Sequence, residues 1–126
     1  MEEEKDKVQV IGDFNVRTGC KGDLYTGEEN ENTNKRVSKD KVVNLEGEQF
    51  LDMIETRGLQ IANGNIKRDE LGEFTYSDTR GASAIDYLLV NNIGLDRIDK
   101  FKVEDGTVSD HQPISATFKV TYRRGK

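Results

Sequence analysis

Three short polar clusters in the chain carry residue types that hydrolytic chemistry uses. Asp13 and Asn15 stand two residues apart in the motif Gly-Asp-Phe-Asn, directly after an apolar run. Asp86 lies inside a second apolar run, where a carboxylate is costly unless it is paired or hydrogen-bonded. His111, the only histidine, follows Asp110 in the motif Ser-Asp-His. Together the clusters offer an imidazole, three carboxylates and a carboxamide.

These groups together suit the attack of a water molecule on a phosphodiester. If Asp86 pairs with His111, it orients the imidazole, and Asp13 can then accept a proton from water. Asp110 would add a carboxylate oxygen for a metal ion, and Asn15 would hold a phosphoryl oxygen. A simpler interpretation stays open for each cluster: a turn at Gly-Asp-Phe-Asn, an edge-strand aspartate facing solvent, and a surface loop at Ser-Asp-His.

Short elements must position these clusters. The run Val8–Ile11 predicts a strand buried on both faces, because its apolar residues barely alternate with polar ones. The polar stretch 17–41 predicts a surface loop that is partly mobile. Acidic residues interrupt the basic residues of this stretch, which favours a solvated surface over a nucleic-acid contact. The basic residues concerned are Lys35, Arg36, Lys39 and Lys41.

One helix is predicted over Leu45–Arg57, with Asn44 as its N-cap and Gly58 as its C-cap. Gly47 in its first turn costs about 1 kcal/mol of helix stability relative to alanine. Short strands are expected at Leu59–Ala62, Glu73–Tyr76, Ala84–Val90, Phe101–Val103 and Ile114–Tyr122. The last of these alternates cleanly between apolar and polar residues, which indicates a strand with one buried face.

These elements predict a single α+β domain over residues 1–126, with a mainly antiparallel or mixed sheet and one main helix. We expect residues 1–7 and 123–126 to be disordered tails. The longest apolar runs are far shorter than a membrane span needs, and the acidic start lacks the apolar core of a signal peptide. Cys20 is the only cysteine, which excludes an internal disulfide and favours an intracellular setting, nuclear or cytoplasmic. The net charge of −5 provides no overall basic field for nucleic acid.

The motifs resemble those of the endonuclease/exonuclease/phosphatase superfamily in their order and in their residues. The closest similarity is to the apurinic-type endonuclease domains of non-LTR retrotransposons and of host proteins derived from them. It rests on the three clusters and also on the segments Gly12–Gly19, Leu59–Gly64 and Phe74–Tyr76. The similar region runs from about Val8 to Val120.

The resemblance implies a role for each of the candidate residues. Asp13 would position the attacking water and Asn15 the scissile phosphate. Asp86 would orient His111, which would contact the phosphate and stabilise its charge. By the same resemblance, Asp110 would lie beside a divalent metal, and Thr75 and Ser83 would bind substrate at the cleft as minor contributors.

The resemblance also implies that the chain is the C-terminal half of a four-layer α/β/β/α sandwich. The first half of the family domain carries the main metal-ligand glutamate and a phosphate-binding tyrosine, so we expect Mg²⁺ to bind weakly or not at all here. The expected function is therefore that of an endonuclease-like domain, inactive alone. The alternatives are a non-catalytic folding or interaction module and, less favoured, a site for a small phosphoester.

Three partners follow from this interpretation. DNA would bind weakly, and a separate first half would complete the site in trans. The apolar face of the alternating strand Ile114–Tyr122 has lost its usual neighbours, so we expect either that a second copy of the chain covers it or that the strand packs against its own sheet. We expect no membrane partner.

Overall fold

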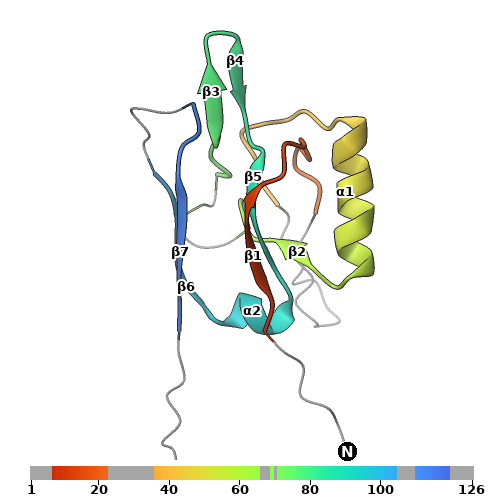
Figure 1. Ribbon diagram of the computed structural model, residues 1–126, viewed down its shortest axis with the longest axis vertical. Helices are drawn as coiled ribbons and strands as arrows, with labels where there is room; N and C mark the ends of the chain where they lie inside the picture. The colour runs from red at the N-terminus through yellow and green to blue at the C-terminus, as the bar shows by residue number, and fades with distance from the viewer. Residues whose placement is uncertain (1–6, 23–35, 66–68, 70, 105–109, 120–126) are drawn as a thin grey trace, which may run out of the picture.

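The computed structural model describes residues 7–22, 36–65, 69, 71–104 and 110–119. It is an α+β fold with antiparallel sheets and one main helix, as expected (Figure 1). In chain order the elements are β1 (Gln9–Asp13), α1 (Leu45–Thr56), β2 (Gln60–Ile61), β3 (Tyr76–Asp78), β4 (Gly81–Ser83), β5 (Asp86–Val90), α2 (Asn92–Asp96), β6 (Ile98–Val103) and β7 (Ile114–Phe118). The expected tails lie outside the described residues except for Lys7.

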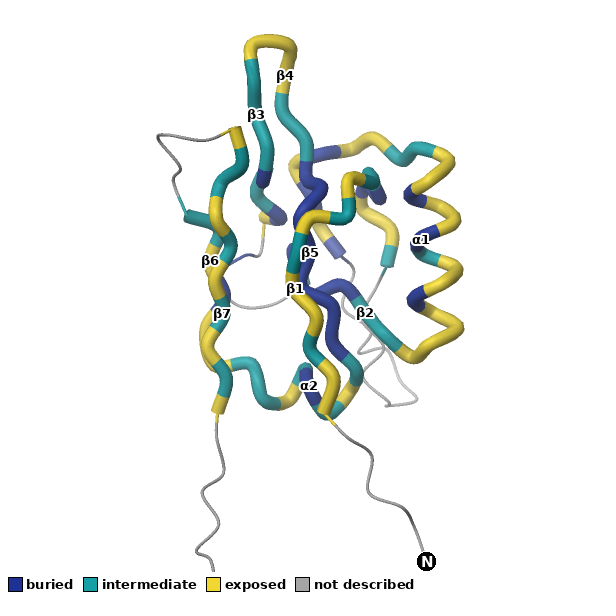
Figure 2. The backbone as a smooth tube through the Cα atoms, viewed as in Figure 1, coloured by how far each residue is buried: buried dark blue, intermediate teal, exposed yellow. Residues whose placement is uncertain are grey.

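Strand β5 is the centre of the fold, and every one of its residues is buried (Figure 2). It pairs with β1 on one side and with β2 on the other, in a sheet of order β1-β5-β2. Successive residues of a strand point to opposite faces, so Tyr87 and Leu89 face α1 while Leu88 and Val90 face the β6–β7 hairpin. The continuous apolar run that predicted this strand is therefore explained by burial on both faces.

The helix α1 covers one face of this sheet. Phe50 and Ile54 are the buried apolar residues that it packs against Tyr87 and Leu89. Asn44 caps the helix, because its side-chain oxygen accepts a hydrogen bond from the amide of Gly47 at 2.8 Å. The predicted helix is thus confirmed to within one residue at its C-terminal end.

The β6–β7 hairpin covers the opposite face. Phe101 is fully buried there beside Leu88 and Val90. Ile114 and Phe118, on the alternating face of β7, pack against the same cluster. Of the two outcomes expected for this face, cover by a second copy or packing against the chain's own sheet, the structure shows the second. The end of the predicted strand, from residue 120, lies outside the described residues.

The prediction that the first strand is buried is also wrong. β1 is an edge strand of its sheet, and Val10 and Ile11 are 40% and 49% exposed. These two side chains point to opposite faces, so neither face of the strand is fully covered. The run of apolar residues was correctly read as a strand, but neither α1 nor the hairpin extends over the sheet edge.

Other differences concern the polar stretches. The predicted strand Glu73–Tyr76 is instead the start of a hairpin, β3–β4, which extends from the upper end of the sheet in Figure 1. The predicted surface loop 17–41 is buried at both of its described ends, where Thr18, Arg36 and Asp40 are almost fully enclosed. Neither of the two helices, in the part of the chain that is described, is long and apolar enough to cross a membrane.

Candidate active site

Asp86 and His111 form a hydrogen-bonded pair, as their residue types suggested. The Nδ1 atom of His111 lies 3.0 Å from Oδ2 of Asp86. The carboxylate is buried at the first residue of β5, whereas 39% of the imidazole side chain is exposed. Because a carboxylate only accepts, Nδ1 carries the proton in this pair, and Nε2 is directed away from Asp86.

Backbone hydrogen bonds hold Asp86 in place. The hydroxyl of Thr75 accepts hydrogen bonds from the amides of Ile85 and Asp86, at 2.9 and 3.1 Å. The side-chain amide of Asn63 donates to the carbonyl of Asp86 at 3.0 Å, and its oxygen accepts from the amide of Leu88 at 2.9 Å. Thr75 and Asn63 are both buried, so the start of β5 is fixed from two sides.

A second set of backbone contacts places His111. The segment 110–112 runs antiparallel to the start of β3, with a bridge between Tyr76 and His111. The amide of Ser77 donates to the carbonyl of Asp110, and the amide of Gln112 donates to the carbonyl of Thr75. The Tyr76 ring packs edge-on against the imidazole at a centroid distance of 5.0 Å. The histidine is therefore held by the base of the β3–β4 hairpin.

Asp13 and Asn15 approach the imidazole from the other side. Asp13 lies opposite Asp86 in the β1–β5 register, and its Oδ2 is 3.6 Å from Nε2 of His111. Its other oxygen accepts the amide of Asn15 at 2.9 Å. Asn15 has φ +54°, the one non-glycine residue with positive φ in the described part of the chain. Asparagine tolerates this conformation better than most residues, and such strain is concentrated at functional sites.

These side chains line one pocket of about 630 Å³. Asp13, Asn15, Ser83 and His111 line it, and the β3–β4 hairpin also contributes Tyr76, Asp78 and Arg80. The remaining lining residues are Arg17, Asn44, Gly81, Ala82 and Ile85. The volume falls within the range of roughly 300–1,000 Å³ that is usual for ligand sites.

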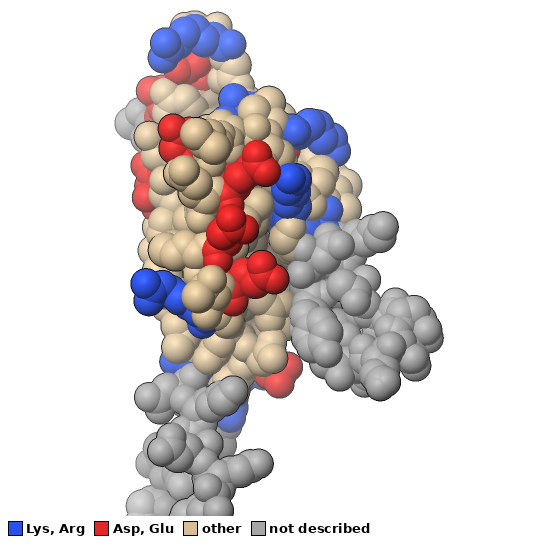
Figure 3. Space-filling model, turned by 90° about the vertical axis from the view of Figure 1, so that its right-hand side faces the viewer, with Lys and Arg blue, Asp and Glu red and all other residues tan. Residues whose placement is uncertain are grey.

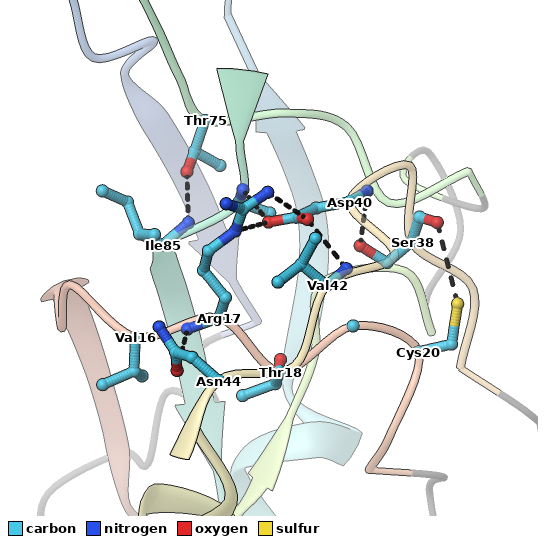
Figure 4. A network of polar contacts seen from close by, with 12 residues as sticks. Val16, Arg17, Thr18, Cys20, Ser38, Asp40, Val42, Asn44, Thr75 and Ile85 are labelled. Atoms are coloured by element: carbon cyan, nitrogen blue, oxygen red, sulfur yellow. Dashed lines mark hydrogen bonds and ion pairs between the residues drawn. The ribbon is translucent and has the colours of Figure 1, made fainter. Parts of the chain in front are cut away.

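An ion pair supports the wall of this pocket (Figure 4). Arg17 donates from Nε and Nη2 to the two oxygens of Asp40, at 2.9 and 2.7 Å. Asp40 also accepts the amides of Val42 and Ala84. Burial alone would raise the pKa of Asp40, but these hydrogen bonds lower it overall, so the carboxylate stays charged. Asp40 thus ties the loop after β1 to the segment that leads into β5.

The charges around the Asp86–His111 pair favour a protonated histidine. The hydrogen bond from His111 to Asp86 raises the pKa of His111 above its ordinary value of 6.5. Partial burial opposes this, and the charges of Asp86, Asp13 and Asp110 add to the increase. A raised pKa in the folded state means that protonation stabilises the fold below pH 6.5. This contribution is lost as the pH rises through the pKa of the folded protein.

We expect Asp86→Asn to remove most of the increase in the pKa of His111. An NMR titration of the imidazole, with the variant and the unchanged chain side by side, measures this. Asp110→Asn is the matched control and should change the pKa less, because Asp110 affects the ring by charge alone and less strongly than Asp86 or Asp13. Equal effects of the two substitutions would contradict the pairing of Asp86 with His111.

The other expected site residues occupy different positions. Ser83 lines the pocket. Thr75 is fully buried and does not line it, so its hydroxyl positions Asp86 instead of meeting substrate. Asp110 is exposed and lies outside the cluster of Asp13, Asp86 and His111, so its expected place beside a metal has no support in this geometry.

Three residues of the site escaped sequence reasoning. Arg17 follows the Gly-Asp-Phe-Asn motif by two residues, and this spacing was the available signal. Asp40 and Asn63 gave none, because each lies in a polar stretch with turn-like composition. Arg36, expected to be solvated, is buried and donates to the carbonyls of Gly19 and Asn63.

The site does not fit a Mg²⁺ ion. Ligand atoms of Asp13, Asp86 and His111 lie within 4.8 Å of one another. However, Mg²⁺ requires near-octahedral oxygen coordination, and this cluster supplies oxygens from two aspartates alone, one of which, Asp86, is buried and accepts a hydrogen bond from the His111 ring. Asp13 is the one exposed carboxylate of this cluster.

The family resemblance of the motifs stays a prediction. A scan of protein-family models, a search of curated proteins and a search of solved structures each found no match to this chain.

Proposed function

We propose that this chain is an endonuclease-like domain whose pocket binds a phosphodiester of DNA. The observation that carries the proposal is the convergence of Asp13, Asn15 and His111 on one open pocket, with Asp86 fixing the imidazole. Each of these groups has a distinct use in hydrolysis of a phosphodiester.

The protonated imidazole is the group suited to the phosphate. Its Nδ1–H donates to Asp86, and Nε2, which lies 3.6 Å from Asp13, can donate to a phosphoryl oxygen and stabilise the negative charge that grows there. The side-chain amide of Asn15, which makes no hydrogen bond in the described structure, can donate to a second oxygen. Asp13 is placed beside Nε2, where a carboxylate can accept a proton from an attacking water.

The same geometry supports binding more strongly than catalysis. Removing one group that stabilises the developing charge typically costs about 10²–10³ in rate, and a divalent cation is the strongest such group in phosphodiester hydrolysis. Because the cluster offers one open carboxylate, we propose that the 126-residue chain binds DNA weakly and does not cleave it. The non-catalytic alternative is favoured by this same shortage of ligands.

The surface charge restricts where DNA can approach. Asp and Glu side chains run down the face formed by α1 (Figure 3). The exposed acidic residues of that helix are Glu46, Glu48, Asp52 and Glu55. A phosphate backbone is repelled from this side, whereas the pocket combines Arg17, Arg80 and His111 with Asp13 and Asp78. The proposed approach is therefore over the upper end of the sheet.

Titration with dimethyl phosphate, the simplest phosphodiester, tests the proposal. We expect the NMR signals of His111 and Asn15 to shift together, and the shift to weaken in His111→Ala when Asn15 is followed. Weak binding should tighten as the pH falls, because the protonated imidazole is the favoured partner of the anion. Shifts confined to residues outside the pocket would contradict the proposed function.

The same protein is then incubated with supercoiled plasmid and Mg²⁺. We expect no nicking above that of the His111→Ala variant. Nicking that is lost both on chelation of the metal and in His111→Ala would show that the chain holds a working metal site, and would replace the binding proposal with a catalytic one.

A further inference from the structure

Arg17 is a fixed cation with unused hydrogen-bond donors at the edge of the pocket. Its guanidinium has five N–H groups. The Nε–H and one N–H of Nη2 donate to Asp40. No acceptor for Nη1 occurs in the described part of the chain, and 33% of the side chain is exposed. The backbone amide is also held, by a 3.2 Å hydrogen bond to Asn44. The side chain is therefore held in place, and its remaining guanidinium N–H groups can donate to a ligand.

The surroundings of Arg17 favour an anion. Asn44 lines the same pocket, and its side-chain oxygen is occupied by the amides of Arg17 and Gly47, which leaves its NH₂ group as a further donor. Asp78 is already satisfied by Tyr76 and by the backbone and side chain of Arg80. Hydrogen bonding to Asp40 raises the pKa of Arg17, so its charge is permanent.

We infer that Arg17 binds a second phosphate, next to the one at His111, so that the pocket recognises a nucleic-acid strand in preference to a single phosphoester. The inference rests on the proposed function and adds to it a second phosphate contact, at Arg17. Arginine suits this task because its planar fork donates to two phosphate oxygens at once. The pocket of about 630 Å³ also extends from His111 past Asn15 to Arg17, beyond what one phosphate group occupies.

The inference predicts how a DNA oligonucleotide binds at different salt concentrations. We expect Arg17→Ala to weaken binding of a fluorescein-labelled single strand about tenfold, as measured by fluorescence anisotropy. The slope of log K against log salt should fall in magnitude by about 0.7, which corresponds to one lost phosphate contact on single-stranded DNA. Arg57→Ala, which removes an exposed arginine outside the pocket, should change neither quantity.

Loss of the ion pair with Asp40 could also disturb the fold, so the unchanged chain provides a second measurement. Phenylglyoxal modifies accessible arginines, and mass spectrometry locates the products. We expect the oligonucleotide to protect Arg17 and to leave Arg57 reactive. Equal protection of the two, or none at Arg17, would overturn the inference.

The outcomes separate the two proposals. If Arg17→Ala binds the oligonucleotide like the unchanged chain while His111→Ala binds it less tightly, the inference about Arg17 fails and the proposed function stands. If the unchanged chain does not bind the oligonucleotide, both fail.

Discussion

Substitution of Gly47 by alanine is expected to destabilise the protein by about 2–3 kcal/mol. Helix propensity alone predicts the opposite sign, a gain of about 1 kcal/mol. The structure reverses this prediction because a Cβ atom at Gly47 would overlap the carbonyl oxygen of Arg17 and press on the Asn44 side chain. Both are backbone or cap positions that are already hydrogen-bonded, so they have little freedom to move.

Chemical denaturation of Gly47→Ala and of Gln49→Ala measures the difference. Gln49 is exposed on the same helix, so its substitution should leave the free energy of unfolding nearly unchanged. A more stable Gly47→Ala variant would show that the loop after β1 does not press on the first turn of α1. We also expect Gly47→Ala to move the NMR signals of Arg17, since that loop must give way.

Substitution of Phe101 by alanine should cost about 3–5 kcal/mol. Phe101 is fully buried between the β6–β7 hairpin and the central strand, where it contacts the cluster around Leu88 and Val90. Against a total stability of roughly 5–15 kcal/mol, this loss is large. Because β7 follows directly after His111, we expect the loosened hairpin to return the pKa of His111 toward its ordinary value.

Phe118→Ala is the matched control on the same hairpin. Phe118 is only partly buried at the end of β7, so its truncation leaves a smaller cavity and should cost less. Thermal unfolding followed by circular dichroism gives the order of stability. Equal losses for the two variants would mean that the hairpin is not centred on Phe101.

The elements that the sequence predicted well are those with a local signal. Asn44 and the apolar stripe of Phe50 and Ile54 predicted α1 because capping and helical spacing act within a few residues. The apolar run containing Leu88 predicted β5 for the same reason. The burial of Val10 and Ile11 was predicted wrongly because it depends on which strand occupies the sheet edge, and that is decided by distant segments.

The candidate site divides in the same way. The pairing of Asp86 with His111 could be predicted from their residue types, since a carboxylate within an apolar strand requires a partner. Thr75 was placed in the cleft by resemblance, whereas the structure uses its hydroxyl on backbone amides. Asp40 gave no signal, because its ion pair with the half-exposed Arg17 joins residues far apart in a polar stretch. Such pairs depend on the tertiary fold and not on local pattern.

The β6–β7 hairpin forms a sheet of its own, and this affects how the site comes apart. Swinging the hairpin away from β5 breaks no backbone ladder between the two sheets. It does break the short backbone contacts of residues 110–112 and the packing of Phe101 against Leu88 and Val90. Such a local opening requires less free energy than global unfolding. It would separate His111 from Asp86, and protonation of the histidine opposes it. The fraction of molecules in which the site is assembled therefore depends on pH, and this fraction falls as the solution becomes more alkaline.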